Sequence, residues 1–177
     1  MARKVFISVL GTGFYNSCKY VKDSFVSSET RFIQQATLEY LKVKNNWNTK
    51  NTEGDVIDRI IILLTDGAKE TNWNKDITTR LNKTGEEESY VRLEQTLNEM
   101  ELPCPVETLS IPDGKSEDEM WTIFNTVYNA LKPNDELYFD LTHSFRYLPM
   151  LVLVLGNPII THFQILQCSL LDETSFG

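Results

Sequence analysis

The residues best suited to chemistry gather in one short stretch, FDLTHSFRYLP, at residues 139–149. A strand-like apolar run ends there in Asp140, and hydroxyl, imidazole and guanidinium groups follow closely: Thr142, His143, Ser144 and Arg146. Asp140 is expected to order the corner by accepting backbone N–H bonds. Thr142 and Ser144 can cap the helix that follows.

Arg146 decides which chemistry this corner favours. It would lie in the first turn of the following helix, where the macrodipole disfavours a cation unless a bound anion interacts with both the helix end and the arginine. The corner therefore favours phosphate binding. A plainer alternative stays open, in which Asp140 and Arg146 pair with each other and His143 satisfies a turn.

A second corner, GTGF at residues 11–14, follows the first strand-like run. Gly11 and Gly13 permit positive φ and a close approach of the backbone to a ligand, and Thr12 adds a hydroxyl. A simple tight turn explains the two glycines equally well. Asn16 stands where a dinucleotide fingerprint needs its third glycine, so an NAD or FAD site is excluded.

A third corner begins with Thr65 and Asp66, directly after the second strand-like run. In an open α/β sheet these corners meet at the carboxyl ends of the strands, where ligands bind. Aromatic residues recur at the corners: Phe14, Tyr15, Trp73 and Phe145. Each is more often core packing than a ligand contact, but aromatic faces beside hydroxyls and an arginine suit adenine bases on a phosphate frame.

The overall composition limits the classes of partner. A chain of 177 residues with 41% hydrophobic content is long enough for one core, so a single domain over residues 1–177 is expected. A net charge of -8 opposes binding to duplex nucleic acid or an anionic membrane. The most apolar segment, residues 147–160, is too short and too interrupted to cross a bilayer. We expect a soluble cytoplasmic protein.

Neither a metal nor an organic cofactor is predicted. Cys18, Cys104 and Cys168 share no CxxC spacing, so neither a disulfide framework nor a zinc site is indicated. His143 and His162 have no cysteine or acidic cluster beside them, and no Ser/His/Asp arrangement follows from the spacing.

Alternating strands and helices must position these corners. Short β-branched runs predict strands at residues 4–10, 58–65, 105–111, 136–142 and 160–168. Apolar residues at helical spacing predict helices around residues 32–41, 90–100 and 120–131. Capping boxes mark the starts of the last two helices: Thr84 with Glu87, and Ser116 with Glu119. The polar segments 43–57 and 67–85 are predicted as surface loops.

The run RIIILL is apolar on both faces, as in a strand covered by helices above and below. The expected fold is therefore α/β, with a doubly wound, mainly parallel sheet and helices on both faces.

Three segments together resemble a known family: KVFISVLGTGFYNSCKYV, ETRFIQQATLEYL and YFDLTHSFRYLPMLVLVL. They are similar to the CRISPR-associated Rossmann fold (CARF) domain, specifically the Csx2-like subfamily of type III CRISPR accessory proteins. The resemblance implies a Rossmann-like homodimeric sensor for antiviral defence that binds a cyclic oligoadenylate across its two-fold axis. Cyclic tetra-adenylate is favoured, and cyclic hexa-adenylate has the same even symmetry.

By motif position, the resemblance assigns ligand-binding residues on three loops: Gly11, Thr12, Gly13 and Phe14; Thr65 and Asp66; and Thr142, His143, Ser144, Phe145 and Arg146. Family members commonly continue into an effector domain, so the chain is expected to control a fused or partner effector. The segment LGNPIITHF, residues 155–163, departs from the family pattern, in which the preceding helix runs longer before a last strand.

The same loops would serve a metal-independent ring nuclease. In that alternative, His143, Ser144 and Arg146 are the candidate catalytic residues. A ribose 2′-hydroxyl attacks the adjacent phosphorus, and a linear product with a 2′,3′-cyclic phosphate results. An unrelated mononucleotide-binding enzyme is a more remote alternative, because its usual phosphate loop is absent.

Overall fold

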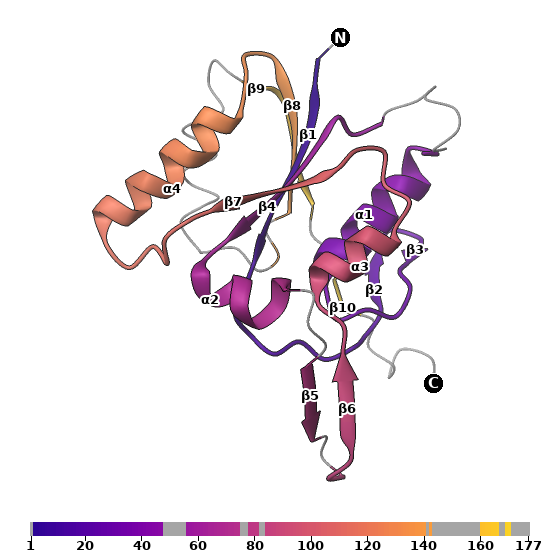
Figure 1. Ribbon diagram of the computed structural model, residues 1–177. Helices are drawn as coiled ribbons and strands as arrows, with labels where there is room; N and C mark the ends of the chain where they lie inside the picture. The colour runs from indigo at the N-terminus through magenta and orange to yellow at the C-terminus, as the bar shows by residue number, and fades with distance from the viewer. Residues whose placement is uncertain are drawn as a thin grey trace.

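A five-stranded parallel sheet forms the centre of the computed structural model, which describes residues 2–47, 56–74, 78–81, 84–140, 142, 160–166 and 169–170. Its strands are β1 (Lys4–Leu10), β4 (Arg59–Leu64), β7 (Val106–Ser110), β8 (Asp135–Asp140) and β9 (Ile160–Leu166). They lie in the order β7-β4-β1-β8-β9, and each neighbouring pair is parallel (Figure 1). The five predicted strands are confirmed, each with its ends shifted by two residues at most.

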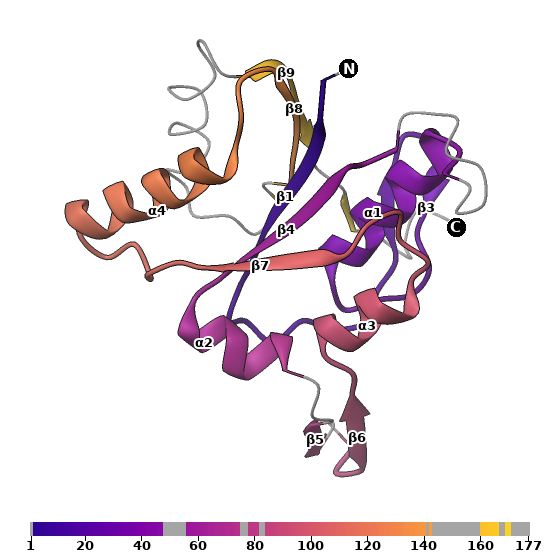
Figure 2. The same cartoon turned by 45° about the horizontal axis from the view of Figure 1, so that its top comes forward.

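Helices cover both faces of this sheet (Figures 1 and 2). α1 (Ile33–Lys44) and α3 (Leu93–Glu99) pack on one face, and α4 (Glu117–Ala130) packs on the other. Strand β4 contributes alternate side chains to the two cores, with Ile60 and Ile62 on the α1 side and Ile61 on the α4 side. The doubly wound α/β architecture is confirmed.

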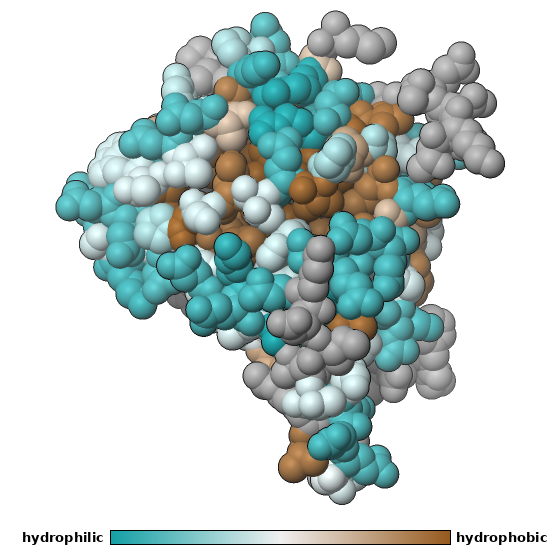
Figure 3. All heavy atoms as spheres, viewed as in Figure 1, coloured by the Kyte–Doolittle hydropathy of each residue, from teal (hydrophilic) through white to brown (hydrophobic). Residues whose placement is uncertain are grey.

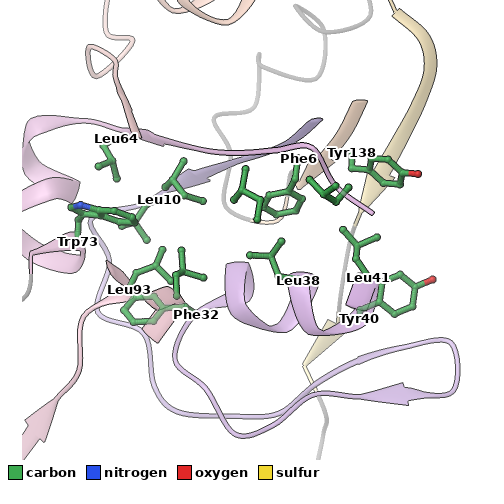
Figure 4. Close-up of a cluster of buried hydrophobic side chains, with 14 of the residues drawn as sticks. Phe6, Leu10, Phe32, Leu38, Tyr40, Leu41, Leu64, Trp73, Leu93 and Tyr138 are labelled. Carbon is green, nitrogen blue, oxygen red and sulfur yellow. The ribbon is translucent and has the colours of Figure 1, made fainter. Parts of the chain in front are cut away.

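The larger core lies between the sheet and α1 (Figure 4). Phe6 and Leu10 of β1 face Leu38 and Leu41 of α1, and all four side chains are almost fully buried. Trp73 extends this core to the carboxyl ends of the strands, where it packs near Leu64 and Leu93 (Figure 4). The loops at that edge are therefore attached to the best-packed part of the molecule.

One predicted helix start is wrong. Residues Glu87–Tyr90 form a strand, β6, which pairs antiparallel with β5 (Thr78–Leu81) in a hairpin that projects from the body (Figure 1). Thr84 therefore caps no helix, and its hydroxyl instead contacts the carboxylate of Glu86 at 3.3 Å. Helix α3 begins only at Leu93, because backbone pairing with β5 holds the preceding residues extended.

The other capping box is confirmed at the start of α4. The Ser116 hydroxyl accepts a hydrogen bond from the backbone N–H of Glu119 at 3.2 Å. The Glu119 carboxylate reaches back to the backbone N–H of Lys115 at 2.7 Å, one residue before the cap.

The predicted surface loop at residues 67–85 is also wrong. A short helix, α2 (Asp66–Ala68), and a π-helical turn, η1 (Lys69–Trp73), follow β4 directly. Asn72 and Trp73 are buried there because their turn packs under the edge of the sheet. In the loop predicted at residues 43–57, α1 continues to Lys44, and residues 48–55 lie outside the described part of the chain.

A small antiparallel sheet was not predicted from the sequence. It consists of β2 (Tyr20–Lys22), β3 (Phe25–Val26) and β10 (Ser169–Leu170), with β10 paired to β2.

On the face shown in Figure 3, hydrophilic side chains predominate and hydrophobic ones show between them. Among the helices of the described ranges, none is long and apolar enough to cross a membrane.

The packing of α1 leads to a direct test of the core. Replacing Leu38, which is fully buried, with alanine should lower the free energy of unfolding by about 2–5 kcal/mol, because a cavity remains. Val43→Ala on the same helix is the control, since Val43 is 66% exposed and its loss should change stability by less than about 0.5 kcal/mol. Urea denaturation measures both variants, and equal stabilities would contradict the assigned core.

Candidate functional site

Strand β1 lies where the strand order reverses, with β4 on one side and β8 on the other. Ligands of open α/β sheets bind outside the carboxyl ends of the strands at this switch point. The three predicted ligand segments follow these three neighbouring strands, at residues 11–14, 65–66 and 142–146. The topology thus brings their starting points to one edge of the sheet.

The loop after β1 is held from below by Asn72. Its side-chain Nδ2 donates to the carbonyl oxygens of Gly11 at 2.7 Å and Gly13 at 3.0 Å. The Asn72 side chain is only 2% exposed, and both hydrogen bonds are partly buried. The sequence did not predict this role, because Asn72 lies in a polar run that resembles a surface loop.

Tyr15 explains one of the two glycines. A Cβ on Gly11 would lie 2.2 Å from the Tyr15 hydroxyl, whereas a Cβ on Gly13 would meet the same ring at 3.5 Å or more. Among the described glycines, positive φ occurs only at Gly85 and Gly114, so Gly11 and Gly13 do not use the left-handed backbone that glycine permits. Gly11 is required by the close approach of a side chain.

The same contact perturbs the phenol. Burial raises the pKa of Tyr15, and hydrogen bonds with the Gly13 and Gly11 backbone partly offset that rise. The hydroxyl therefore stays protonated at neutral pH and serves to shape the loop.

The loop after β4 has one structural and one exposed member. Thr65 is buried, and its hydroxyl accepts from the backbone N–H of Ala68 at 3.1 Å, which caps α2. Asp66 is exposed beside it. A Cβ on Gly67 would lie 3.2 Å from the methyl group of Thr12, so the loops after β1 and β4 are packed against each other.

The end of β8 is ordered by Asp140, as predicted. Its Oδ1 accepts from the backbone N–H of Thr142 at 3.1 Å and from the Thr142 hydroxyl at 2.7 Å. Its Oδ2 accepts from the hydroxyl of Ser8 at 2.8 Å, directly across the β1–β8 pair. Asp140 and Ser8 are both buried, so this polar link fixes the first residue of the third segment.

The remaining candidates of this segment, His143, Ser144, Phe145 and Arg146, lie outside the described residues. The choice between a phosphate-binding Arg146 and an Asp140–Arg146 pair therefore stays a prediction.

A cleft of about 650 Å³ opens between the loops after β1, β4 and β7, and Thr142 of the third segment is not among the residues that line it. Four predicted ligand residues line it: Gly11, Thr12, Thr65 and Asp66. Residues after β7, which the sequence did not indicate, complete it: Ile111, Pro112, Asp113, Lys115 and Glu119. The structure does not bring Phe14 into this cleft, because Phe14 and Gly13 line a smaller neighbouring pocket that also includes Thr12.

Local charge in the cleft is mixed. The Lys115 ammonium lies 2.6 Å from the Asp113 carboxylate, and this ion pair raises the pKa of Lys115. Within the described ranges, no group of three or more His, Cys, Asp or Glu side chains is arranged to hold a metal ion. The cleft offers a ligand hydroxyls, loop backbone and one lysine, together with three carboxylates, those of Asp66, Asp113 and Glu119.

Comparison with known proteins gives one finding. Residues 5–167 match the family model described as "CRISPR system endoribonuclease Csx1, CARF domain". The match covers nearly all of the 177 residues, including all three loops. No curated protein matches the chain.

Asn72 is the first target for testing the site's framework. Asn72→Ala should lower the free energy of unfolding by about 1–3 kcal/mol, because two loop carbonyls would be left without their buried donor. Asn74→Ala is the matched control, since Asn74 ends the same turn and is exposed. Chemical denaturation compares the two, and equal stability would show that Asn72 does not hold the loop.

The two glycines give a second test. Gly11→Ala should lower the melting temperature because the new Cβ and the Tyr15 hydroxyl cannot both keep their places, whereas Gly13→Ala should be nearly neutral. Adding Tyr15→Phe to Gly11→Ala removes the clashing oxygen and should recover part of the stability. Thermal unfolding gives the melting temperature of all three variants. A melting temperature lowered as much by Gly13→Ala as by Gly11→Ala would contradict the proposed packing.

Proposed function

We infer a function from the family to which the chain belongs, the CARF domain family of Csx1 CRISPR system endoribonucleases. The proposed function is that of a sensor which binds a cyclic oligoadenylate. Family membership confirms the resemblance to CARF domains that the sequence indicated. The Csx2-like subfamily stays a prediction, since the matched description is that of Csx1.

The observation that carries the proposal is the cleft at the carboxyl edge of the sheet. Gly11 and Thr12 from the β1 loop and Thr65 and Asp66 from the β4 loop line it together. Its volume of about 650 Å³ lies within the range of about 300–1,000 Å³ typical of small-ligand sites. A ring of four nucleotides is larger than one such ligand, which favours a ring shared by two copies across a two-fold axis.

In this proposal the chain is one CARF domain over residues 1–177 that controls a fused or partner effector, in the cytoplasm, as part of type III CRISPR defence. Cyclic tetra-adenylate is the favoured ligand and cyclic hexa-adenylate the other candidate. Neither a metal nor an organic cofactor takes part.

Calorimetric titration with cyclic tetra-adenylate and cyclic hexa-adenylate tests ligand and assembly together. We expect one ring per two chains, a dimer by light scattering at saturation, and a melting temperature that rises with ligand concentration. Absence of binding to either ring would contradict the proposed function. A monomer at saturating ligand would contradict the shared site.

Chromatography of the ring after incubation separates the sensor from the ring nuclease. An intact ring supports a sensor without chemistry of its own. A linear product with a 2′,3′-cyclic phosphate, formed without added metal, supports the nuclease alternative with His143, Ser144 and Arg146 as its candidate residues.

Arg146 provides the sharpest single variant. Arg146→Ala should weaken ring binding by about 10- to 150-fold for each charge-assisted hydrogen bond to phosphate that alanine cannot make, with the fold retained. Lys132→Ala is the control, because Lys132 is an exposed cation beside the amino end of β8, far from the loops. An unchanged dissociation constant in Arg146→Ala would remove this residue from the site.

A further inference from the structure

A second pocket, of about 220 Å³, lies beside the cleft. Four segments distant in sequence line it, and they contribute Thr12, Phe14, Arg31, Thr71, Tyr90 and Arg92. Thr12 also lines the larger cleft, so a ligand lying there can reach the pocket directly. Arg31, Tyr90 and Arg92 belong to none of the three predicted ligand loops.

One wall of the pocket is a cluster of two aromatic rings and a guanidinium, formed by Phe14, Arg31 and Tyr90. The rings of Phe14 and Tyr90 meet edge to face, with centres 5.1 Å apart and planes at 89°. The guanidinium carbon of Arg31 lies 5.0 Å from the centre of the Phe14 ring and 4.6 Å from that of Tyr90. Such faces stack nucleic acid bases well.

Hydrogen bonds hold this cluster in place without a ligand. Arg31 Nε donates to the backbone oxygen of Tyr15 at 2.8 Å, and Arg31 Nη1 donates to that of Val91 at 3.4 Å. The Tyr90 hydroxyl donates to the carboxylate of Glu88 on the same strand. Arg31 thereby joins the β1 loop to the base of the β5–β6 hairpin, which projects beside it (Figure 2).

Two cations gather here in a chain whose net charge is -8. Arg92 Nη1 donates to the backbone oxygens of Glu70, at 2.8 Å, and Thr71. The Glu70 carboxylate belongs to a residue of the same pocket and offsets part of this charge. The aromatic wall, more than the net charge, therefore distinguishes the pocket from the cleft.

We infer that this pocket binds one adenine base of the cyclic oligoadenylate, packed against Phe14, Arg31 and Tyr90. The inference rests on the proposed function. The pocket is smaller than the roughly 300 Å³ at which sites for whole drug-sized ligands begin, so it suits a single base and excludes the ring itself. The hairpin, through Tyr90, then belongs to the ligand site.

Binding of cyclic tetra-adenylate to Tyr90→Ala and Tyr90→Phe, measured at several salt concentrations, tests the inference. Removal of a base-stacking side chain should weaken binding about 5- to 150-fold in Tyr90→Ala, while Tyr90→Phe keeps the ring and should stay within about threefold of the wild type. The salt dependence should be the same in all three, because neither substitution alters a charge that faces phosphate. Tyr128→Ala, at an exposed tyrosine of α4, is the matched control.

Each other outcome overturns the inference in a distinguishable way. Wild-type protein that binds neither ring refutes the proposed function and this inference with it. Tight wild-type binding that Tyr90→Ala leaves unchanged refutes the base pocket alone. Weaker binding in both Tyr90→Ala and Tyr90→Phe, or a shallower salt dependence in Tyr90→Ala, would show that the hydroxyl or a phosphate is recognised and would refute base stacking.

Discussion

The parallel pairing of β1 with β4 on one side and β8 on the other is the constraint on which the site depends. It makes the chain leave the sheet at three adjacent points, and two buried polar anchors then fix the loops there. Asp140 links Ser8 of β1 to Thr142, and Asn72 holds the carbonyls of Gly11 and Gly13. Contacts of this kind favour one geometry, because breaking them would leave the buried side chain of Asn72 or Asp140 without its partners.

At this edge of the sheet, buried residues hold the loops in place and exposed residues can contact a ligand. Thr65, Asn72 and Asp140 are nearly inaccessible and keep the loops in place. Phe14, 45% exposed, and Asp66 face outward and are available to a ligand. The chain belongs to the CARF domain family, and this division suits a ligand-binding domain, because a preformed surface loses less conformational freedom when its ligand binds.

The sequence predicted the sheet well because its strands carry strong local signals. Residues 60–64 are apolar on both faces, and Ser116 with Glu119 is a capping box that the structure keeps. Thr84 with Glu87 has the same spacing, yet Glu87 starts a strand, because pairing with residues 78–81 outweighs a local preference. Asn72 and the Arg31–Tyr90 contact escaped prediction for a related reason. Each joins residues about sixty positions apart, and no local pattern encodes such a contact.

We propose that the carboxyl edge of the sheet receives the cyclic oligoadenylate. Titration of isotope-labelled protein with cyclic tetra-adenylate, followed by amide chemical shifts, tests this placement. We expect the largest shifts at residues 11–14, 65–67 and 142, with smaller ones at residues 90–92. Shifts confined to residues 120–130 of α4 or to the amino ends of the strands, or no shifts at saturating ring, would contradict this proposal.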